Sequence, residues 1–116
     1  MPFQLKRIYD PVEESDGFRV LVDRLWPRGI KKENAKIDLW LKEISPSNEL
    51  RKWVHADPAR WDEFRARYFA ELESQQESVD LLLKKAKAGK VTLLFSAKNE
   101  QQNNAVALKE YLEKLL

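Results

Sequence analysis

Two short apolar runs constrain the fold of this chain more than any other feature. Phe18 to Asp23 and Val91 to Phe95 consist almost wholly of apolar and β-branched residues. Continuous runs of this kind are typical of strands that are buried on both faces, as in a parallel sheet. A long segment with helical periodicity separates the two runs, and parallel strands are joined by crossovers of that kind.

A third run, Leu5 to Tyr9, adds a predicted strand near the beginning of the chain. We therefore predict an α/β fold in which a small, mainly parallel sheet of three or more strands is covered by helices. The sequence contains no linker, repeat or low-complexity stretch, so we expect a single compact domain over residues 1–116. The link from Asp10 to Gly17 is short for a crossover helix, and this leaves the relative direction of the first two strands open.

The segment between the second and third predicted strands carries the periodicity of helices. Apolar residues recur at spacings of three and four, which predicts four helices there and a fifth after Phe95. The expected boundary signals are Ser45-Pro46, Asp57-Pro58, a capping box at Ser74–Glu77, a stop at Gly89, and caps at Asn99 and Gln102. The expected inward faces are Ile37, Trp40, Leu41 and Ile44; Leu50, Trp53 and Val54; Trp61, Phe64, Tyr68 and Leu72; Val79, Leu82, Leu83 and Ala86; and Ala105, Leu108, Leu112 and Leu115.

Composition removes several classes of function. The 116 residues include no cysteine and one histidine, His55, which excludes disulfides, thiolate ligands and multi-histidine metal centres. Lys and Arg number 21 against 19 Asp and Glu, a net charge of +2, which argues against a purely electrostatic nucleic-acid binder. No apolar run approaches the roughly 20 residues that span a bilayer. We predict a cytoplasmic protein with no metal, no organic cofactor and no membrane partner.

The most informative polar residues follow the second predicted strand. Asp23 and Arg24 come directly after it, and Trp26 and Arg28 follow within the same loop. The carboxyl ends of parallel strands carry the ligand sites of open α/β sheets. Arginine presents a planar fork of donors suited to phosphate or carboxylate, so we predict that Arg24 and Arg28 hold an anion and that Trp26 walls the pocket. In the structural alternative, Asp23 pairs with Arg24 internally and Trp26 fills the core.

A second polar group follows the third predicted strand. Ser96 and Lys98 come next, and Asn103 and Asn104 lie at the beginning of the last predicted helix. A helix N-terminus with such side chains is suited to binding an anion. If the sheet is parallel, Ser96 and Lys98 join Arg24 and Arg28 at one edge. In the structural alternative, neighbouring residues cap the helix, and Asn103 and Asn104 face solvent.

His55 is a candidate for acid–base chemistry. It titrates near neutrality and lies four residues after Arg51, on the same face of a predicted helix. If a reaction is catalysed, the acid–base role falls to Asp23 or His55, and the sequence does not choose between them. In the structural alternative, Asp57 is an N-cap and His55 is a cation favoured at a helix C-terminus. A hydrolase triad of Ser96, His55 and Asp57 lacks the Gly-x-Ser-x-Gly turn.

Three sequence blocks carry a family resemblance. Val20 to Gly29, Leu50 to Tyr68, and Val91 to Lys98 with Asn103–Ala105 occur in the expected order. The chain resembles the YeaO-like branch of the domain-of-unknown-function 488 (DUF488) family. The resemblance implies a compact bacterial α/β protein with no established activity, and it favours parallel first strands. Many members of the wider family have cysteines and a histidine after the third strand. This chain has serine and asparagines there, which removes any thiol-dependent metal or redox role.

Three functions remain open on the sequence. The first is a pocket for a small phosphorylated or carboxylated molecule. The second is a nucleic-acid-associated protein that uses the same arginines on phosphates. The third is an interaction module in which the arginines form structural ion pairs. The nucleic-acid hypothesis needs a broad exposed strip that includes Lys31, Lys32, Lys84, Lys85 and Lys87. Ligand identity, turnover and oligomeric state do not follow from the sequence.

Overall fold

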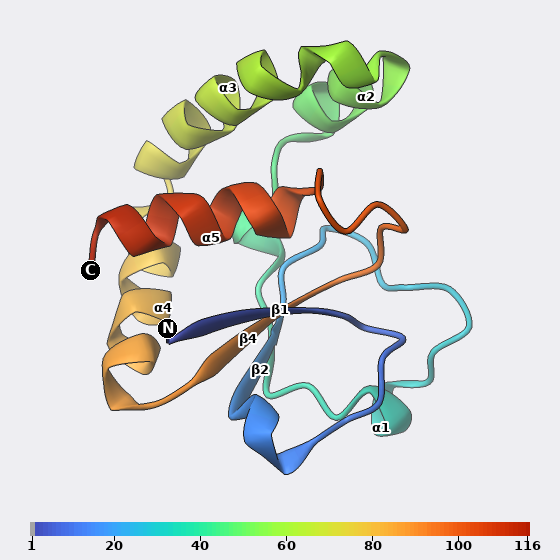
Figure 1. Ribbon diagram of the computed structural model, residues 1–116, viewed down its shortest axis with the longest axis vertical. Coiled ribbons are helices and arrows are strands. Elements are labelled where there is room, and N and C mark those ends of the chain that lie inside the picture. Colours follow the sequence, from blue (N-terminus) through green and yellow to red (C-terminus); the bar gives the residue numbers. More distant parts are fainter. Residues whose placement is uncertain (1) are drawn as a thin grey trace.

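Four parallel strands form one sheet in the computed structural model of the chain, which describes residues 2–116 (Figure 1). The strands are β1 (Phe3–Arg7), β2 (Phe18–Leu21), β3 (Leu39–Trp40) and β4 (Val91–Phe95). Their order is β1-β4-β2-β3, and every neighbouring pair is parallel. The predicted α/β fold with a small parallel sheet is confirmed, and the first two predicted strands run in the same direction.

The two central strands are those with the most continuous apolar sequence. All five residues of β4 are buried, and so are the last three of β2. β1 lies at an edge and is mostly half-buried, which accommodates the polar residues Gln4 and Lys6. A central strand has strands on both sides and layers on both faces, so it tolerates few polar side chains.

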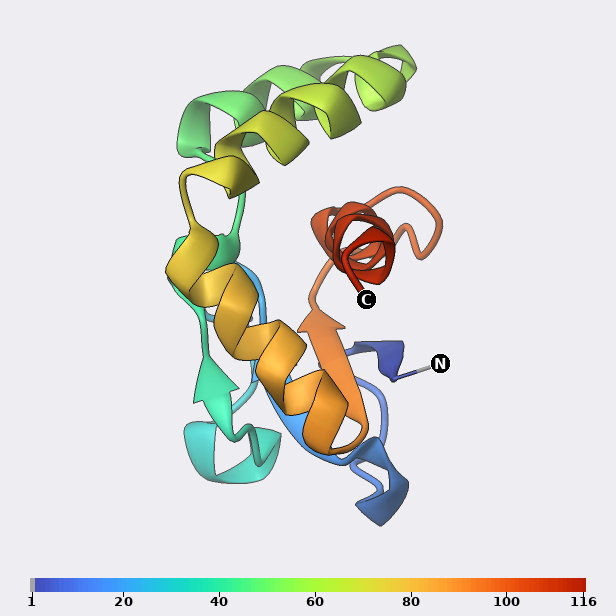
Figure 2. The same ribbon diagram turned by 90° about the vertical axis from the view of Figure 1, so that its left-hand side faces the viewer.

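Four helices lie on one side of the sheet. They are α2 (Asn48–Ala56), α3 (Trp61–Glu73), α4 (Gln76–Ala88) and α5 (Asn104–Lys114). α4 and α5 pack against the strands, whereas α2 packs against α3 and α3 packs against α4 and α5; α4 lies in front of the sheet in Figure 2. Among residues 2–116, no helix combines the length and apolar character that crossing a membrane requires. The buried residues of these helices join those of β1, β2 and β4, so the main hydrophobic core lies between the helical layer and the sheet.

The other face of the sheet is covered by loops and short helical turns. These include α1 (Lys32–Ala35) and the 3-10 helix η1 (Glu14–Asp16). A smaller apolar cluster lies on this face, made of Ile8, Leu21, Ala35 and Leu94, with Trp26, Ile30, Ile37 and Trp40 packed against it. Because both faces are covered, β2 and β4 carry apolar residues at successive positions.

The prediction of a helix through Ile37 and Ile44 is wrong. Ile37 precedes β3, and Ile44 is the last residue of the 3-10 helix η2 (Lys42–Ile44), which follows β3. The backbone of β3 pairs with the outer edge of β2, which would otherwise be unpaired. The apolar residues expected on one helical face are instead divided between the two faces of the sheet, with Leu41 and Ile44 in the main core and Ile37 and Trp40 in the smaller cluster.

Two predicted helix boundaries are confirmed and one is shifted. Asp57 accepts a hydrogen bond from the N–H of Ala59 at 3.0 Å and begins the 3-10 helix η3 (Pro58–Arg60), which leads into α3. Gly89 follows the last residue of α4. The cap of α2 is Ser47 rather than the predicted Ser45, because its hydroxyl accepts from the N–H of Leu50 at 3.2 Å.

The two later helix starts were predicted wrongly. No capping box forms at Ser74–Glu77, because the Ser74 hydroxyl donates to the carbonyl of Glu71 at 2.7 Å, at the end of α3. α5 begins at Asn104, and its cap is Asn103, whose Oδ1 accepts from the N–H of Val106 at 3.0 Å. Several residues in each of these segments have side chains that could cap a helix, and the path of the preceding loop decides which of them is at the N-cap position.

A buried ion cluster lies beside η1 and was not predicted. The fully buried carboxylate of Asp16 accepts from Nζ of Lys6 at 2.9 Å and from the guanidinium of Arg19. Arg19 also donates to the carbonyls of Ala35 at 3.0 Å and Lys36 at 3.2 Å, and this ties α1 to β2. Lys6 of β1 and Arg19 of β2 are thus accounted for by one cluster between the sheet and its covering loops.

Candidate functional site

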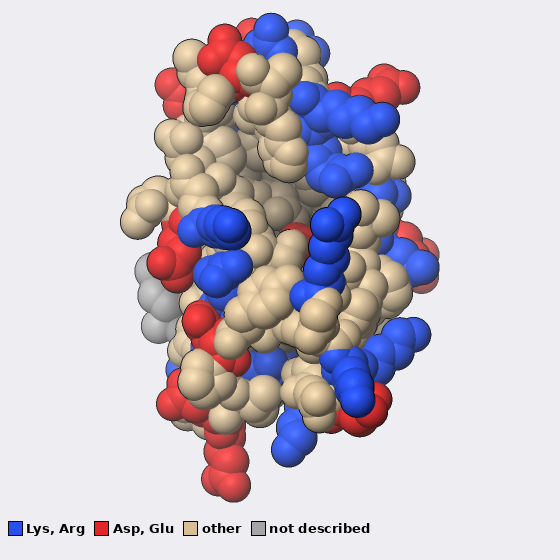
Figure 3. Space-filling model, turned by 90° about the vertical axis from the view of Figure 1, so that its right-hand side faces the viewer, with Lys and Arg blue, Asp and Glu red and all other residues tan. Residues whose placement is uncertain are grey.

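A hollow of about 780 Å³ opens at the carboxyl edge of the sheet. It is lined by the loops that follow β2 and β4, by the turn at Ser45-Pro46, and by α2, η3 and the beginning of α3. In Figure 3, which faces this edge, Lys and Arg side chains gather around the hollow. The hollow lies where parallel strands β2 and β4 end side by side, which is the usual place for a ligand site in an open α/β sheet.

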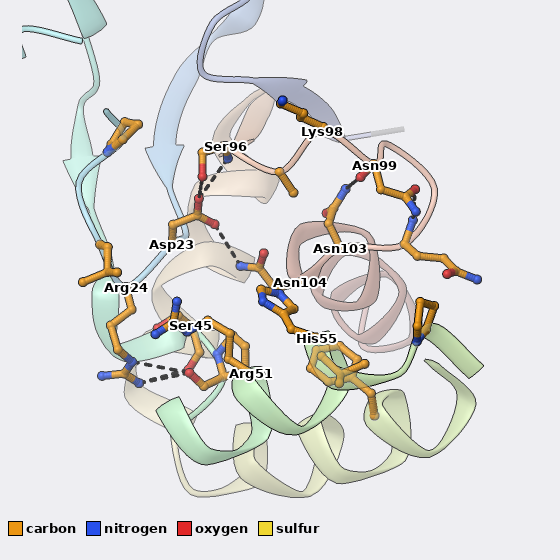
Figure 4. A pocket seen from close by; sticks show the side chains of 18 of the residues that line it. Asp23, Arg24, Ser45, Arg51, His55, Ser96, Lys98, Asn99, Asn103 and Asn104 are labelled. Carbon is orange, nitrogen blue, oxygen red and sulfur yellow. Dashed lines mark hydrogen bonds between the residues drawn. The ribbon is translucent and has the colours of Figure 1, made fainter. Parts of the chain in front are cut away.

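The structure brings all nine predicted site residues to this one hollow. They come from the loops after β2 and β4, from α2 and from the beginning of α5, and Figure 4 shows these segments converging. Their roles stay predictions. The nine residues are Asp23, Arg24, Trp26, Arg28, His55, Ser96, Lys98, Asn103 and Asn104.

Asp23 is the polar centre of the hollow (Figure 4). One carboxylate oxygen accepts from the backbone N–H and the hydroxyl of Ser96, both at 2.9 Å, and the other accepts from Nδ2 of Asn104 at 3.2 Å. Asn104 also donates to the carbonyl of Val22 at 3.0 Å, and Nε1 of Trp40 donates to the carbonyl of Asp23 at 2.8 Å. Asp23 therefore ties the ends of β2 and β4 to the beginning of α5.

Arg24 points away from Asp23, toward the turn at Ser45-Pro46 (Figure 4). Its guanidinium donates to the carbonyls of Ser45 and Pro46 at 3.3 to 3.4 Å, which is long for an N–H···O hydrogen bond. Within residues 2–116 it forms no ion pair with a carboxylate. The internal Asp23–Arg24 pair considered above is therefore not formed, and Arg24 keeps donors for a ligand.

Arg28 and Lys98 are exposed at the rim of the hollow. The loop that carries Arg28 is anchored because its carbonyl accepts from the Tyr9 hydroxyl at 2.9 Å. Arg7 anchors the loop that carries Lys98 by donating to the carbonyls of Ser96 and the next residue, at 3.1 and 2.9 Å. In the described part of the chain, neither rim cation forms an ion pair.

Arg51 also lines the hollow, although it was not predicted as a ligand residue. It lies one turn before His55 on α2, and this spacing of four residues could have predicted that both side chains face the same site. Its guanidinium donates to Oδ1 of Asn48 at 3.1 Å, but its buried Nε has no hydrogen-bond partner among the described residues. Buried N–H groups of native proteins nearly always have a partner, so this donor is the least satisfied in the hollow.

His55 lines the hollow from α2 and is exposed. The Ser96 hydroxyl donates to Asp23 rather than to His55, and the Asp57 carboxylate caps η3. These contacts do not make a Ser–His–Asp triad. In residues 2–116, no cluster of three or more His, Asp or Glu side chains is arranged to hold a metal ion.

Trp26 and Asn103 each have structural contacts as well as a place in the hollow. Nε1 of Trp26 donates to the carbonyl of Ile30 at 2.7 Å, and its ring packs edge-on against Trp40 with centroids 5.3 Å apart. Asn103 caps α5. Because these contacts account for both side chains without a ligand, we expect the two residues to shape the hollow rather than to hold charge.

Residues 2–116 match the family described as the inactive DUF488-N3 subclade. The chain belongs to the DUF488 family. It is 50% identical over 115 residues to the uncharacterised protein YeaO of Escherichia coli (strain K12), which is 99% of this chain and all of that protein. An uncharacterised protein of Mycobacterium tuberculosis (strain H37Rv) is 44% identical over 78 residues, 67% of this chain and 66% of that protein. No solved structure matches the chain.

The three blocks that carry the DUF488 resemblance surround the hollow. The first block supplies the loop after β2, the second supplies α2, η3 and the beginning of α3, and the third supplies the loop after β4. The lining residues that lie outside these blocks are Tyr9, Ser45, Pro46, Asn99 and Gln102. The resemblance predicted from the sequence is confirmed, and the residues that carry it are largely those of one site.

The apolar wall of this DUF488 site was missed in the sequence. Helical periodicity assigned Trp61 and Phe64 to the core, and Phe64 is indeed buried there. Trp61 is only partly buried and also lines the hollow. A periodic pattern identifies the apolar face of a helix, but it does not tell which part of that face lies beside an open cavity. The apolar wall, on the side of α2, η3 and α3, consists of Val54, Pro58, Trp61 and Phe64.

The turn beside Arg24 depends on Tyr68. Its buried hydroxyl donates to the carbonyl of Ile44 at 2.6 Å, and burial raises the pKa of this hydroxyl well above its usual value. Tyr68→Phe should lower the free energy of unfolding by about 1–2 kcal/mol, because a buried carbonyl loses its partner. Urea melts would measure this. Tyr111→Phe is the matched control, since the Tyr111 hydroxyl makes no hydrogen bond within residues 2–116; equal losses would contradict the prediction.

Proposed function

We propose that this hollow binds a small molecule that carries a phosphate or carboxylate group. One observation supports the proposal above the others: Arg24, Arg28, Arg51 and Lys98 all line the hollow, and none forms an ion pair in the described residues. Elsewhere in the described residues some cations are paired, such as Arg65 with Glu110, and others, such as Lys84 and Lys87, are exposed on α4 without an ion pair. The four cations of the hollow differ from these because they converge on one concave site. A group of unpaired cations around one concave site favours an anion.

The negative charge within the hollow does not offset these cations. Asp23 is the one acidic side chain among the lining residues, and its carboxylate already accepts hydrogen bonds from Ser96 and Asn104. Hydrogen bonds between guanidinium groups and anions are about twice as strong as neutral ones. The volume of about 780 Å³ falls within the roughly 300–1,000 Å³ of small-molecule pockets.

We propose binding rather than turnover. The matched family is described as inactive, and both carboxylate oxygens of Asp23 are occupied by donors. If a reaction does occur, His55 supplies an exposed imidazole to the hollow. A His55→Gln variant that binds inorganic phosphate as tightly as the wild type would support a site that does not use His55.

The nucleic-acid alternative is less well supported. Lys84, Lys85 and Lys87 are exposed on α4, and Figure 1 has α4 on the side of the sheet opposite to the loops that line the hollow. Lys31 and Lys32 lie at α1, on the other face of the sheet from α4. The lysines that a continuous basic strip needs are therefore distributed over different sides of the molecule.

Titration with inorganic phosphate and citrate tests the proposal. Both anions should raise the melting temperature in low salt and raise it less in high salt, because the attraction is screened over about 8–10 Å. Replacing Arg24 or Arg28 by Met should weaken binding by about 1.5–3 kcal/mol, roughly 10- to 150-fold, by calorimetry. Lys87→Met removes the same charge from α4, outside the hollow, and should leave the affinity unchanged.

The stability of the same variants separates a ligand site from structural ions. The two arginine variants should unfold at the same urea concentration as the wild type, because no ion pair is lost. Trp26→Ala should lower both stability and affinity, since it removes packing against Trp40 as well as a wall of the hollow. A loss of about 3–5 kcal/mol in Arg24→Met, with no anion shifting the wild-type melting temperature, would refute the proposal.

A further inference from the structure

The hollow has two walls of different chemistry. Its sheet-edge side carries Asp23, Ser96 and Lys98, while the side formed by α2, η3 and α3 carries Val54 and Trp61. A pocket for a bare phosphate or carboxylate ion needs polar groups all round. An apolar wall opposite cations instead suits a ligand that has an apolar part and an anionic part.

An aromatic stack runs through the core and ends at the hollow. Trp61 stacks on Phe64 with centroids 5.3 Å apart and an interplanar angle of 21°, and Phe64 stacks on Tyr68 at 5.7 Å and 28°. Phe64 and Tyr68 are buried, whereas Trp61 is only partly buried and lines the hollow. The outer end of the stack is therefore in contact with the hollow, and stacked rings attract each other beyond their buried area.

Leu25 adds a second apolar surface at the same hollow. It lies between Arg24 and Trp26, lines the hollow, and is 61% exposed, more than any other large apolar side chain in residues 2–116. Exposed leucines that stand alone are ordinary, but one on the lip of a cavity with an aromatic wall provides contact area for an apolar ligand group. The volume of about 780 Å³ also exceeds what a phosphate ion fills.

We propose that the ligand is an organic anion in which a flat apolar ring carries the phosphate or carboxylate group. This inference rests on the anion-binding function proposed above and adds the chemical class of the ligand. The ring lies against Trp61 and Leu25 and extends the aromatic stack. The anionic group meets the unpaired cations Arg24, Arg28 and Lys98. Arg51, with its unpartnered Nε, lies on α2 three residues before Val54 of the apolar wall.

Two matched pairs of anions test the ring preference on the full chain. Phenyl phosphate is compared with methyl phosphate, and benzoate with acetate, by calorimetry in low salt. In at least one pair the aromatic member should bind about tenfold or more tightly, which is the size expected from stacking and burial of one ring. Binding of the aromatic member should also change the intrinsic tryptophan fluorescence, because Trp61 gains a stacked neighbour.

Three variants locate the preference. Trp61→Leu and Leu25→Ser should each reduce the aromatic preference while leaving the affinity for methyl phosphate or acetate unchanged. Trp53→Leu is the matched control, because Trp53 is a partly buried tryptophan of α2 that does not line the hollow. Its preference should equal that of the wild type. Leu25 is exposed, so its variant keeps the test decisive even if Trp61→Leu fails to fold.

The outcomes separate this inference from the proposed function. Equal affinities within both pairs, with binding still lost in Arg24→Met, would overturn the ring preference and leave the anion site standing. An aromatic preference that is unchanged in both Trp61→Leu and Leu25→Ser would also overturn it. No binding of any of the four anions would overturn the proposed function and the inference together.

Discussion

Replacing Asp16 by asparagine should lower the free energy of unfolding by about 3–5 kcal/mol at neutral pH, the cost of removing one partner from a buried ion pair. The Asp16 side chain is fully buried, and it contacts Lys6 and Arg19, whose side chains are 10% and 5% exposed. Asparagine keeps the shape but removes the charge. Two cations would then be buried without their shared carboxylate, and urea melts should show the loss directly.

The pH dependence of this effect has a defined sign. Burial alone would raise the pKa of the Asp16 carboxyl, but hydrogen bonds from Lys6, the Glu13 backbone and Arg19 outweigh it and hold the pKa below its usual 3.8. A lowered pKa contributes stability that is fully present above the unfolded value and is lost as the pH falls through the folded one. The gap between the wild type and Asp16→Asn should therefore be constant above about pH 5 and narrow below about pH 4.

Glu13→Gln is the control for this prediction. Glu13 also pairs with Lys6, at 3.0 Å, but its side chain is 62% exposed. An exposed pair contributes about 0–1 kcal/mol, so Glu13→Gln should have little effect at any pH. A loss in Asp16→Asn no larger than that of Glu13→Gln would show that the buried cluster does not stabilise the fold.

Gly17→Ala should destabilise the protein by about 3 kcal/mol or more, because two separate costs coincide at this position. Gly17 has φ +66° and ψ −131°, a conformation that residues with a Cβ rarely adopt. An added Cβ would lie 2.4 Å from the backbone carbonyl oxygen of Lys90. That carbonyl accepts the N–H of Phe18 at 2.9 Å where β2 meets β4, so it cannot move without disturbing the centre of the sheet.

Substitutions at the other two glycines distinguish the cost of backbone strain from the cost of the steric contact with Lys90. Gly29 has φ +78° with nothing within 4 Å of an added Cβ, so Gly29→Ala carries only backbone strain, about 1–2 kcal/mol. Gly89 has an extended backbone and open space around it, and Gly89→Ala should change stability by no more than about 0.5 kcal/mol. Urea melts of the three variants should rank in that order. Equal losses of stability in Gly17→Ala and Gly29→Ala would contradict the prediction, because they would mean that the contact between the added Cβ and the Lys90 carbonyl costs no free energy.

The sheet and the place of the site could be predicted from the sequence. The runs that became β2 and β4 are apolar at nearly every position because all of β4 and the last three residues of β2 are buried. This pattern can be recognised in each run by itself, without knowledge of its neighbours in the fold. A parallel sheet puts the residues after both strands at one edge, so Asp23, Arg24, Ser96 and Lys98 were brought together by an argument from topology alone. Residue chemistry and chain direction were sufficient for that step.

Only the tertiary structure shows which segments pair in the sheet and which side chains form hydrogen bonds with one another. The residues around Leu39 and Trp40 have a helical spacing, yet they form β3 because the open edge of β2 is beside them. Asp23 binds Ser96 and Asn104, far along the chain, and leaves its neighbour Arg24 unpaired. Local periodicity and adjacency reflect what a segment prefers in isolation. Backbone pairing, ion pairing and the boundary between core and cavity depend on which distant segments become neighbours, and their free energies outweigh the local preferences.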